Sequence, residues 1–437
     1  MRSTKIKFGV VCVAGSVLAL SVGWAGGAGA ATPVGAGTAS ATKSICGKGT
    51  GKKATGKAIK LGGIGMLIPG VDFTTIGKFA NAYFQCVNDN GGINGRPISY
   101  KLYNEQLNPT QQASLAKKLI ESDKVVGIVG NTSFTECGTN WKYYKSKGFT
   151  IIGAGVQAEC FGTPTFVETN MGPRYSNIGA AQALVRRGAK SLVVASPDTI
   201  SAYADGGVVK VAEAAGIPSK VFAIKLPITD ANSTVLQLVQ AAGDGGGVII
   251  DFTPDSAPAL LQAAISQGLV DKVLWGSSTP IANEFMAKQF PQFDGKIHIN
   301  QEFSNITDNT PDLVLYRAIT KKYAPKIALQ AFSQMGFMAG KFATQALMDA
   351  AAKGEVTAKS YNEAVRNLKN VKTDMLCKPW YVGKNLAYHI PNNWDITVTY
   401  KDGKVVQEDK CFAIQAVDKE LTQTRAWEKQ FKLNTGK

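Results

Sequence analysis

The sequence predicts an α/β protein with two Rossmann-like, doubly wound lobes, each a mostly parallel sheet covered by helices on both faces. Short apolar runs alternate with amphipathic segments from residue 59 onward, the order of elements that produces such layers. The runs are continuously apolar, as strands covered on both faces must be. The roughly 380 residues from position 58 onward exceed one ordinary hydrophobic core, so two domains are expected.

Individual elements can be placed from these patterns. Buried strands are predicted at residues 59–67, 125–130, 191–195 and 248–252. Apolar residues at helical spacing predict helices within residues 76–87, 109–120 and 331–352. Gly354 is expected to end the last of these helices. No repeat of 20 to 50 residues is visible, which argues against a solenoid.

The first 30 residues have the layout of a secretory signal peptide. Three basic residues precede an apolar stretch at residues 8–24, and small residues lead up to Ala30, where cleavage is expected. An uncleaved membrane anchor is the alternative, but glycines interrupt a stretch that is short for a bilayer core of about 30 Å. The mature protein is therefore expected in the periplasm or at the outer face of the cell membrane.

Residues 31–57 are predicted as a flexible basic tail, because they hold five lysines and no acidic residue among Gly, Ala, Thr and Ser. Loss of the signal peptide lowers the formal net charge of +16 to about +13. The tail suits attraction to anionic envelope polymers or headgroups, and a plain spacer is the simpler interpretation. Export argues against a nucleic-acid partner.

Cysteine usage agrees with export. After Cys12 leaves with the signal peptide, six cysteines remain, namely Cys46, Cys86, Cys137, Cys160, Cys377 and Cys411. An even number in an exported protein predicts three disulfides, although sequence alone leaves about fifteen connectivities. Short separations favour Cys137 with Cys160 and Cys377 with Cys411, which leaves Cys46 for Cys86.

The sequence offers no recognisable set of catalytic or metal-binding residues. No C-x-x-C motif occurs, and of the two histidines His298 has apolar neighbours while His389 has no recognisable partner. Asp251 and Asp255 could do general acid–base work, but ligand contact or helix capping explains them more simply. Residues 51–57 approach the glycine-rich pattern of a phosphate-binding loop, but the Ser or Thr that should follow the last lysine is missing. The chain is therefore not expected to be an enzyme, and no cofactor or metal is expected.

A glycine-rich block carries a family resemblance. Residues 88–98 spell N-x-x-G-G-I-N-G-R-x-I, which closely resembles the branched-chain amino-acid (Leu/Ile/Val) binding proteins, class I periplasmic solute-binding proteins of ABC importers. Gly91 and Gly92 suit a helix end there, and Gly95 permits a tight turn into the next strand. Weaker matches follow in the family's order at residues 108–113, 151–155 and 275–277.

The resemblance implies the type I periplasmic binding protein fold, with two lobes joined by three crossovers near residues 170–174, 300–304 and 375–379. The first lobe is then residues 58–172 plus 303–376, and the second lobe is residues 173–302 plus 377–430. Solute is expected between the lobes, at the carboxyl ends of the strands. Hinge bending would close the lobes over it.

Matching the family's motifs places ten residues in the solute pocket. The first lobe is expected to contribute Phe73, Ser133, Phe134, Thr135, Ala154 and Gly155. The second lobe is expected to contribute Tyr203, Phe252, Thr253 and Ser278, with Tyr203 as the family's stacking tyrosine. Structural roles compete for three of them: Phe252 as core, Ser133 as a helix cap and Tyr203 as a surface aromatic.

One departure from the family bears on the solute. Amino-acid binders of this family place an acidic residue in the second lobe to pair with the ligand ammonium, whereas residues 277–279 here carry hydroxyls. A buried ammonium without a carboxylate would be costly. An amide, a small organic acid or an aromatic carboxylate is therefore expected in place of a plain α-amino acid, unless Asp251 or Asp255 supplies the missing charge.

The function expected from the sequence is that of an extracytoplasmic, monomeric receptor. It would close on a small polar solute, amino-acid-like, amide or small organic acid, and deliver it to an ABC permease in the membrane. A ligand-sensing receptor for a membrane kinase or chemoreceptor is one alternative, and an exported enzyme is another. Function must be argued from the site because the fold alone does not decide it.

Overall fold

The first of the two large sheets holds five parallel strands. The computed structural model describes residues 44–382 and 390–434. The strand order in the first sheet is β4-β1-β5-β6-β7. The strands are β1 (Ile59–Gly65), β4 (Ile98–Asn104), β5 (Gly127–Asn131), β6 (Ile151–Gly153) and β7 (Phe166–Glu168). Because the chain proceeds from β1 to one neighbour and then to the other, a switch point lies between β1 and β5, where open α/β sheets bind ligands.

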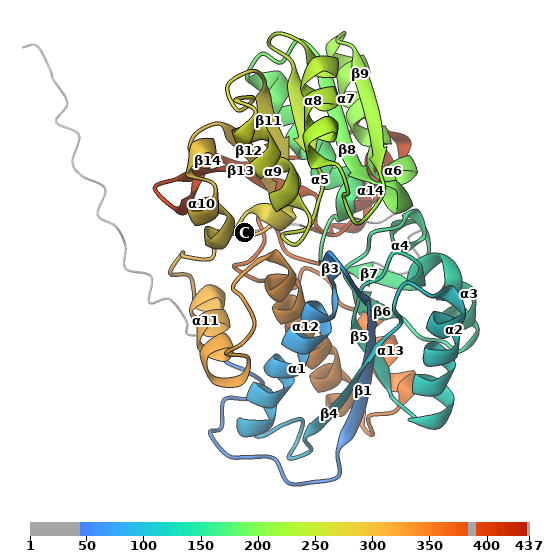
Figure 1. Ribbon diagram of the computed structural model, residues 1–437. Helices are drawn as coiled ribbons and strands as arrows, with labels where there is room; N and C mark the ends of the chain where they lie inside the picture. Colours follow the sequence, from blue (N-terminus) through green and yellow to red (C-terminus); the bar gives the residue numbers. More distant parts are fainter. Residues whose placement is uncertain (1–43, 383–389, 435–437) are drawn as a thin grey trace, which may run out of the picture. The chain divides into compact units, whose positions relative to one another are not determined.

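Helices cover both faces of this sheet (Figure 1). One face is covered by α1 (Thr74–Asp89), α11 (Pro311–Tyr323), α12 (Ala331–Lys353) and α13 (Ala358–Arg366). The other carries α2 (Pro109–Lys117), the π-helical turn η1 (Lys118–Ser122), α3 (Glu136–Ser146) and α4 (Ala158–Gly162). Glycine brings α12 close to α1, since a Cβ at Gly336 would lie 2.4 Å from the carbonyl oxygen of Ile76.

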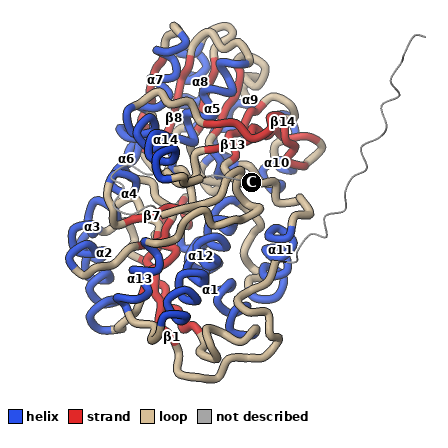
Figure 2. The backbone as a smooth tube through the Cα atoms, turned by 180° about the vertical axis from the view of Figure 1, so that it is seen from behind, coloured by secondary structure: helices blue, strands red, loops and turns tan. Residues whose placement is uncertain are grey.

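The second sheet has seven strands in the order β14-β13-β12-β11-β10-β8-β9. They are β8 (Leu192–Pro197), β9 (Ser219–Ile224), β10 (Gly247–Ile250), β11 (Leu274–Ser277), β12 (Ile297–Gln301), β13 (Trp394–Lys401) and β14 (Lys404–Ala413). The strands from β12 to β9 are parallel, and β13 and β14 add an antiparallel edge beside α10 (Figure 2).

The helices of the second lobe surround this sheet. They are α5 (Gly172–Arg186), α6 (Asp198–Ala204), α7 (Gly206–Ala215), α8 (Ala231–Ala242), α9 (Ala257–Ser266), α10 (Glu284–Gln289) and α14 (Lys419–Phe431), with the short 3-10 turns η2 (Thr279–Ile281) and η3 (Pro291–Phe293). Buried side chains such as Leu184 of α5 and Leu238 of α8 face the sheet. Among the residues that the structure describes, no helix has both the length and the apolar character of a membrane span.

The chain passes between the two sheets three times. It does so between β7 and α5, between β12 and α11, and between α13 and β13. This is the type I periplasmic binding protein topology, and the expectation of two doubly wound lobes with three crossovers is confirmed. His389 and its neighbours in residues 383–389, within the third crossover, lie outside the described part of the chain.

The first predicted strand is shorter than expected. It ends at Gly65, and residues 66–73 form a separate hairpin from β2 (Leu67–Ile68) and β3 (Val71–Asp72). The hairpin begins because the Met66 amide donates to Thr132, and the Phe73 amide then closes back on the carbonyl of Met66 at 2.9 Å. Continuous apolarity could not reveal this turn, which carries the hairpin toward the second lobe.

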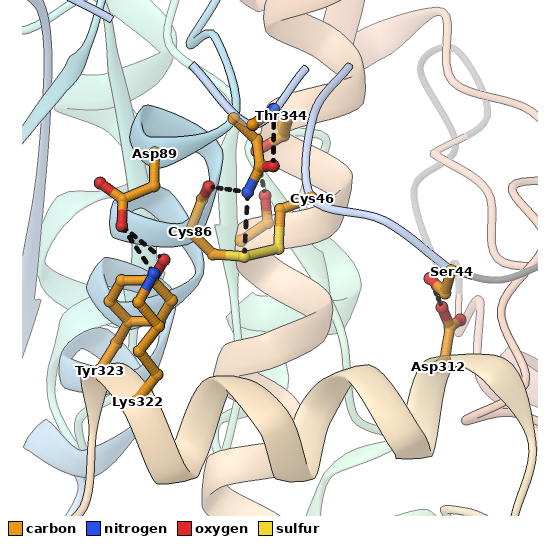
Figure 3. The surroundings of a disulfide bond; sticks show 11 residues. Ser44, Cys46, Cys86, Asp89, Asp312, Lys322, Tyr323 and Thr344 are labelled. Carbon is orange, nitrogen blue, oxygen red and sulfur yellow. Dashed lines mark hydrogen bonds and ion pairs between the residues drawn. A yellow bond between two sulfur atoms is a disulfide. The ribbon is translucent and has the colours of Figure 1, made fainter. Parts of the chain in front are cut away.

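The expected tail, residues 31–57, needs a correction at its described end. Cys46 is 2% exposed and bonded to Cys86 of α1, and the Ala54 amide donates to Asn88 at 2.8 Å. Ser44 donates to Asp312 of α11, as Figure 3 shows. Residues 44–57 are therefore held on the first lobe, because a disulfide and backbone hydrogen bonds override a composition typical of flexible segments. The signal peptide and residues 31–43 lie outside the described residues.

The two cysteine pairs favoured by short sequence separation are present, and so is the pair that they left over. Cys46 is bonded to Cys86, Cys137 to Cys160 and Cys377 to Cys411. The first two lie within the first lobe. The third joins the segment after Leu376, in the third crossover, to strand β14 of the second sheet.

Candidate functional site

A pocket lies where residues from the carboxyl ends of both sheets meet. Its volume is about 60 Å³. The first lobe lines it with Phe73, Ile76, Thr132, Phe134, Ala154, Val156, Asn170, Phe332 and Met335. The second lobe lines it with Gly172, Pro173, Ser176, Pro197, Ile200, Asp251, Phe252, Thr253, Ser278, Pro280 and Glu302. This is the position at which open parallel sheets bind small ligands.

The first lobe supplies a mainly apolar wall. Phe73 contacts Phe134 and Phe332 edge to face, with ring centroids 5.2 and 5.4 Å apart. Such contacts between aromatic rings are favourable beyond the area they bury. Ile76 from α1 and Met335 from α12 complete this wall. An apolar portion of a solute would be sheltered from water here.

The second lobe supplies buried carboxyl groups. Asp251, directly after β10, accepts hydrogen bonds from Ser278 Oγ at 2.5 Å and from Asn177 Nδ2 at 2.9 Å. Burial raises the pKa of the Asp251 carboxyl to about 7 despite these bonds. Near neutral pH both of its protonation states are therefore accessible, and the neutral form is a hydrogen-bond donor as well as an acceptor.

Glu302, directly after β12, is the second carboxyl on the wall. One of its oxygens accepts the backbone amide of Met171 at 2.6 Å. Burial raises the pKa of Glu302 to about 8, and the charge of nearby Asp251 adds to the shift. None of the described residues that line the pocket is Lys, Arg or His. The polar side of the pocket is therefore acidic, without a side-chain cation to balance it.

Six of the ten residues predicted from the sequence lie on the pocket wall. They are Phe73, Phe134, Ala154, Phe252, Thr253 and Ser278. Thr253 also donates a hydrogen bond to Gly70 of the first lobe. Contact of these six with a solute remains a prediction.

Three predicted residues of the first lobe lie close to the pocket but outside its lining. Ser133 Oγ donates to Glu105 at 2.6 Å and lies 3.1 Å from the Thr135 hydroxyl, so both hydroxyls have protein partners. The carbonyl of Gly155 accepts from Asn170 Nδ2 at 2.9 Å. The Ser133 side chain is directed by Glu105, which is distant in the chain, whereas Gly155 has no side chain and takes part through its carbonyl.

Tyr203 departs most from its predicted role, because it does not line the solute pocket. It lines a second cavity of about 200 Å³ with Phe161, Tyr175 and Arg174, among others. Its ring stacks on Phe161 with centroids 6.5 Å apart, and the Arg174 guanidinium lies 5.7 Å from its centroid. The structure thus places Tyr203 in packing between α6 and α4, outside the solute pocket.

Glu302 was missed by the sequence reasoning, and Asp251 was considered only as an alternative. Both are acidic residues that directly follow a buried strand, a signal that would have identified Glu302 as well. Residues 277–279 carry hydroxyls as the sequence shows, and Asp251, the alternative source of the second-lobe charge, lies beside them on the pocket wall. The Ser278 hydroxyl is itself bonded to a carboxylate oxygen of Asp251, so carboxyl groups are present at the pocket after all.

The two lobes are in direct contact at the hairpin. The carbonyl oxygen of Gly70, between β2 and β3, accepts hydrogen bonds from Thr253 Oγ1 at 2.8 Å and from Ser256 Oγ at 2.7 Å. Both hydroxyls precede α9 of the second lobe. The two lobes therefore meet beside the pocket in this structure.

Among the described residues, one group of potential ligands is close enough to hold an ion, formed by Cys137, Cys160 and Glu168. The two cysteines are joined as a disulfide, which removes the thiolates that bind metals. His298 Nδ1 lies 2.9 Å from a carboxylate oxygen of Glu408 on β14, and His298 does not line the pocket.

Comparisons with known proteins agree with this geometry. The family model described as periplasmic binding protein matches residues 74–397. The chain therefore belongs to the periplasmic binding protein family, a family of small-molecule receptors. No curated protein sequence matches the chain.

Solved structures share the fold at low sequence identity. A fatty acid ABC transporter substrate-binding protein from Thermomonospora curvata is 20% identical with a TM-score of 0.71, covering 84% of this chain and 95% of that one. A branched-chain amino acid ABC transporter protein from Thermus thermophilus with bound valine is 13% identical with a TM-score of 0.72, over 83% and 98%. A solute-binding protein from R. palustris in complex with 4-hydroxybenzoate is 18% identical with a TM-score of 0.67, over 82% and 98%.

Proposed function

We propose that the protein is an extracytoplasmic receptor that closes on a small solute and delivers it to an ABC importer. The observation that carries this proposal is the pocket, which takes its apolar wall from one lobe and its carboxyl groups from the other. A solute that spans both would hold the lobes together. Several structural relatives are described as ABC transporter components, and this supports the importer as the partner.

The chemistry of the wall narrows the solute. Two buried carboxyls and no side-chain cation favour a solute with N–H donors, such as an ammonium or an amide, beside a small apolar body. A solute whose sole polar group is a carboxylate would place three acidic groups together, which is costly in a buried site. Of the solutes expected from the sequence, amides and amino-acid-like compounds are thus preferred over organic acids.

The remaining expectations complete the proposal. The protein is exported by a signal peptide cleaved near Ala30, acts as a monomer and uses no cofactor. It binds its solute without changing it. Binding without chemical change is supported by the composition of the pocket. Its acids are hydrogen-bonded to protein groups, and none of the described residues that line it is a histidine or a cysteine.

A thermal-shift screen of the oxidised protein tests the proposal. The panel should contain amino acids, amides, amines, short organic acids and aromatic carboxylates at matched pH. A solute at 100 times its dissociation constant stabilises the folded state by about 2.7 kcal/mol, which gives a visible rise in Tm. We expect hits among amides or ammonium compounds, recovered unchanged by mass spectrometry.

The matched control is Glu136→Gln, which alters a buried carboxyl of the first lobe that does not line the pocket. It should keep the response to any hit, whereas Asp251→Asn should weaken it. Chemical conversion of a hit would contradict the receptor function. A screen in which only organic acids stabilise the protein would contradict the proposed solute class.

A further inference from the structure

Glu302 belongs to the pocket and to the crossovers at the same time. Its carboxyl lines the pocket, and one carboxylate oxygen accepts the Met171 amide at 2.6 Å. Met171 lies in the first crossover and is the residue directly before α5, whereas Glu302 begins the second crossover directly after β12. One side chain thus joins two of the segments about which the lobes must rotate.

The third crossover also reaches this residue. Asn392, in the third crossover just before β13, donates from Nδ2 to the carbonyl oxygen of Glu302 at 3.4 Å. The Glu302 amide in turn donates to Thr279 Oγ1 at 3.2 Å. With 3% of its surface exposed, Glu302 has little room to leave these partners. The main chain of Glu302 is thus held by the third crossover and by Thr279, while its carboxyl is hydrogen-bonded to the amide of Met171 in the first crossover.

The charged groups that face Glu302 are acids. Asp251 faces it from the end of β10, and Asp395 faces it from β13. Burial raises the pKa of Glu302 to about 8, and burial with the nearby Glu302 charge raises the pKa of Asp395 well above its ordinary value. No described Lys, Arg or His forms an ion pair with Glu302, so the neutral carboxyl is favoured until a donor group arrives.

We propose that Glu302 couples solute binding to lobe rotation by changing the strength of its hydrogen bond to the Met171 amide. An N–H group of the solute would favour the ionised carboxylate. An ionised acceptor forms a hydrogen bond roughly twice as strong as a neutral one, and the N-terminus of α5 favours a negative charge at this position. The solute thereby fixes the first and second crossovers to each other. This coupling rests on the proposed function, because it requires a solute with a donor in this pocket.

A measurement without solute tests the hinge half of the proposal. Deuterium exchange of the peptide spanning residues 169–175 is followed at pH 6 and pH 9 and corrected for the intrinsic pH dependence of amide exchange. Ionisation of Glu302 should increase the protection of this peptide at pH 9 about two- to tenfold in the unaltered protein, given a gain of roughly 0.5–1.5 kcal/mol per hydrogen bond. Glu302→Gln keeps an acceptor oxygen but cannot ionise, so its protection should not change with pH.

Two variants separate coupling from a general effect of buried acids. Asp251→Asn removes the other pocket carboxyl and should retain the pH-dependent protection. Glu136→Gln removes a buried carboxyl whose pKa burial also raises to about 8, in the first lobe, and should retain it too. Protection that is independent of pH in the unaltered protein, or equally pH-dependent in Glu302→Gln, would overturn the proposal.

The solute half is tested with a hit from the screen. At pH 6 the solute should protect residues 169–175 in the unaltered protein and in Asp251→Asn at saturation, but not in saturated Glu302→Gln. Equal protection in saturated Glu302→Gln would contradict the coupling while leaving the receptor function intact. If no solute binds the unaltered protein, the receptor function fails, and the pH experiment still decides whether Glu302 controls the crossover.

Discussion

At the scale of residues, the pocket is defined by how its carboxyl groups are buried. Asp251 is held by one hydroxyl and one amide, and Glu302 by a backbone amide. These partners reduce the cost of burying the ionised forms but do not remove it, so burial still raises the pKa values to about 7 and about 8. The pocket can therefore gain negative charge when a cationic group enters it.

Affinity for an ammonium-bearing solute should increase with pH. In the free pocket the carboxyls bind protons up to pH 7 or 8, and the solute cation must displace them, so binding releases protons. Each carboxyl contributes up to about tenfold per pH unit below its free pKa, and the increase should end above pH 8. Titration calorimetry between pH 5.5 and 8.5, in buffers of different ionisation enthalpy, measures both the affinity for the solute and the number of protons released on binding.

The variant for this prediction is Asp251→Asn, which should bind more weakly and show a shallower pH dependence. Glu136→Gln serves as the control, since that residue also lies in a buried acid pair but outside the pocket lining. An affinity that falls as the pH rises from 6 to 8 would contradict the role of the carboxyls as partners of a cation.

At the scale of elements, the β2–β3 hairpin links the lobes. It leaves the first sheet after Gly65 and places the carbonyl of Gly70 against two hydroxyls at the start of α9. A two-strand hairpin has little stability by itself, and contacts with other elements are what hold it in place. The hairpin is therefore suited to engage the second lobe only when the lobes are close.

Ser256→Ala should shorten the lifetime of the closed, solute-bound state. The Ser256 hydroxyl bonds to Gly70 but does not line the pocket. Loss of one neutral hydrogen bond costs about 0.5–1.5 kcal/mol, so solute dissociation should accelerate roughly two- to tenfold with little change in association. Stopped-flow displacement measures both rates. Ser256→Thr retains the hydroxyl as a control, and an unchanged dissociation rate in Ser256→Ala would argue against the link.

The disulfide between Cys46 and Cys86 should stabilise the first lobe. It ties residues 44–57 to α1 across a sequence separation of 40 residues. Replacing both cysteines with alanine should lower the free energy of unfolding by roughly 3–4 kcal/mol on the loop-entropy model. Urea denaturation measures the change, and solute affinity should remain near its original value because neither cysteine lines the pocket. An unchanged midpoint would show that the segment is held by its hydrogen bonds alone.

At the scale of the whole molecule, function depends on two lobes that are joined by crossovers, by hydrogen bonds beside the pocket and by packing such as that of Tyr203 on Phe161. Each lobe has its own sheet, and the pocket needs residues from both. Solute binding and lobe closure are therefore linked, because a solute stabilises the closed arrangement by the difference in its affinity for the two states.

Small-angle scattering should detect this closure. A saturating solute is expected to decrease the radius of gyration of a monomer whose mass stays constant, with one solute bound per chain. Asp251→Asn at matched saturation should reach the same compact value, since it weakens binding without altering the crossovers. A radius of gyration that does not respond to a bound solute, or an increase in mass on binding, would contradict closure within one chain.

The sequence by itself determined the architecture and the class of protein. Continuous apolar runs separated by helical patterns were sufficient for two doubly wound lobes, and the glycine block at residues 88–98 indicated the family. Short sequence separation favoured two cysteine pairs and left Cys46 for Cys86, and all three pairs are present. Six wall residues were found by matching the family's motifs, and strand ends are where open parallel sheets bind ligands.

Only the tertiary structure decided which side chains line the pocket. Tyr203 follows a strand as expected but packs on Phe161 of the other lobe, and Ser133 turns toward Glu105. Glu302 lines the pocket, and its carboxylate accepts a hydrogen bond from the amide of Met171, which is 131 residues away in sequence. Side-chain direction depends on partners that are brought together by folding, and hydrophobic periodicity, which reports which face of an element is buried, carries no information about those partners.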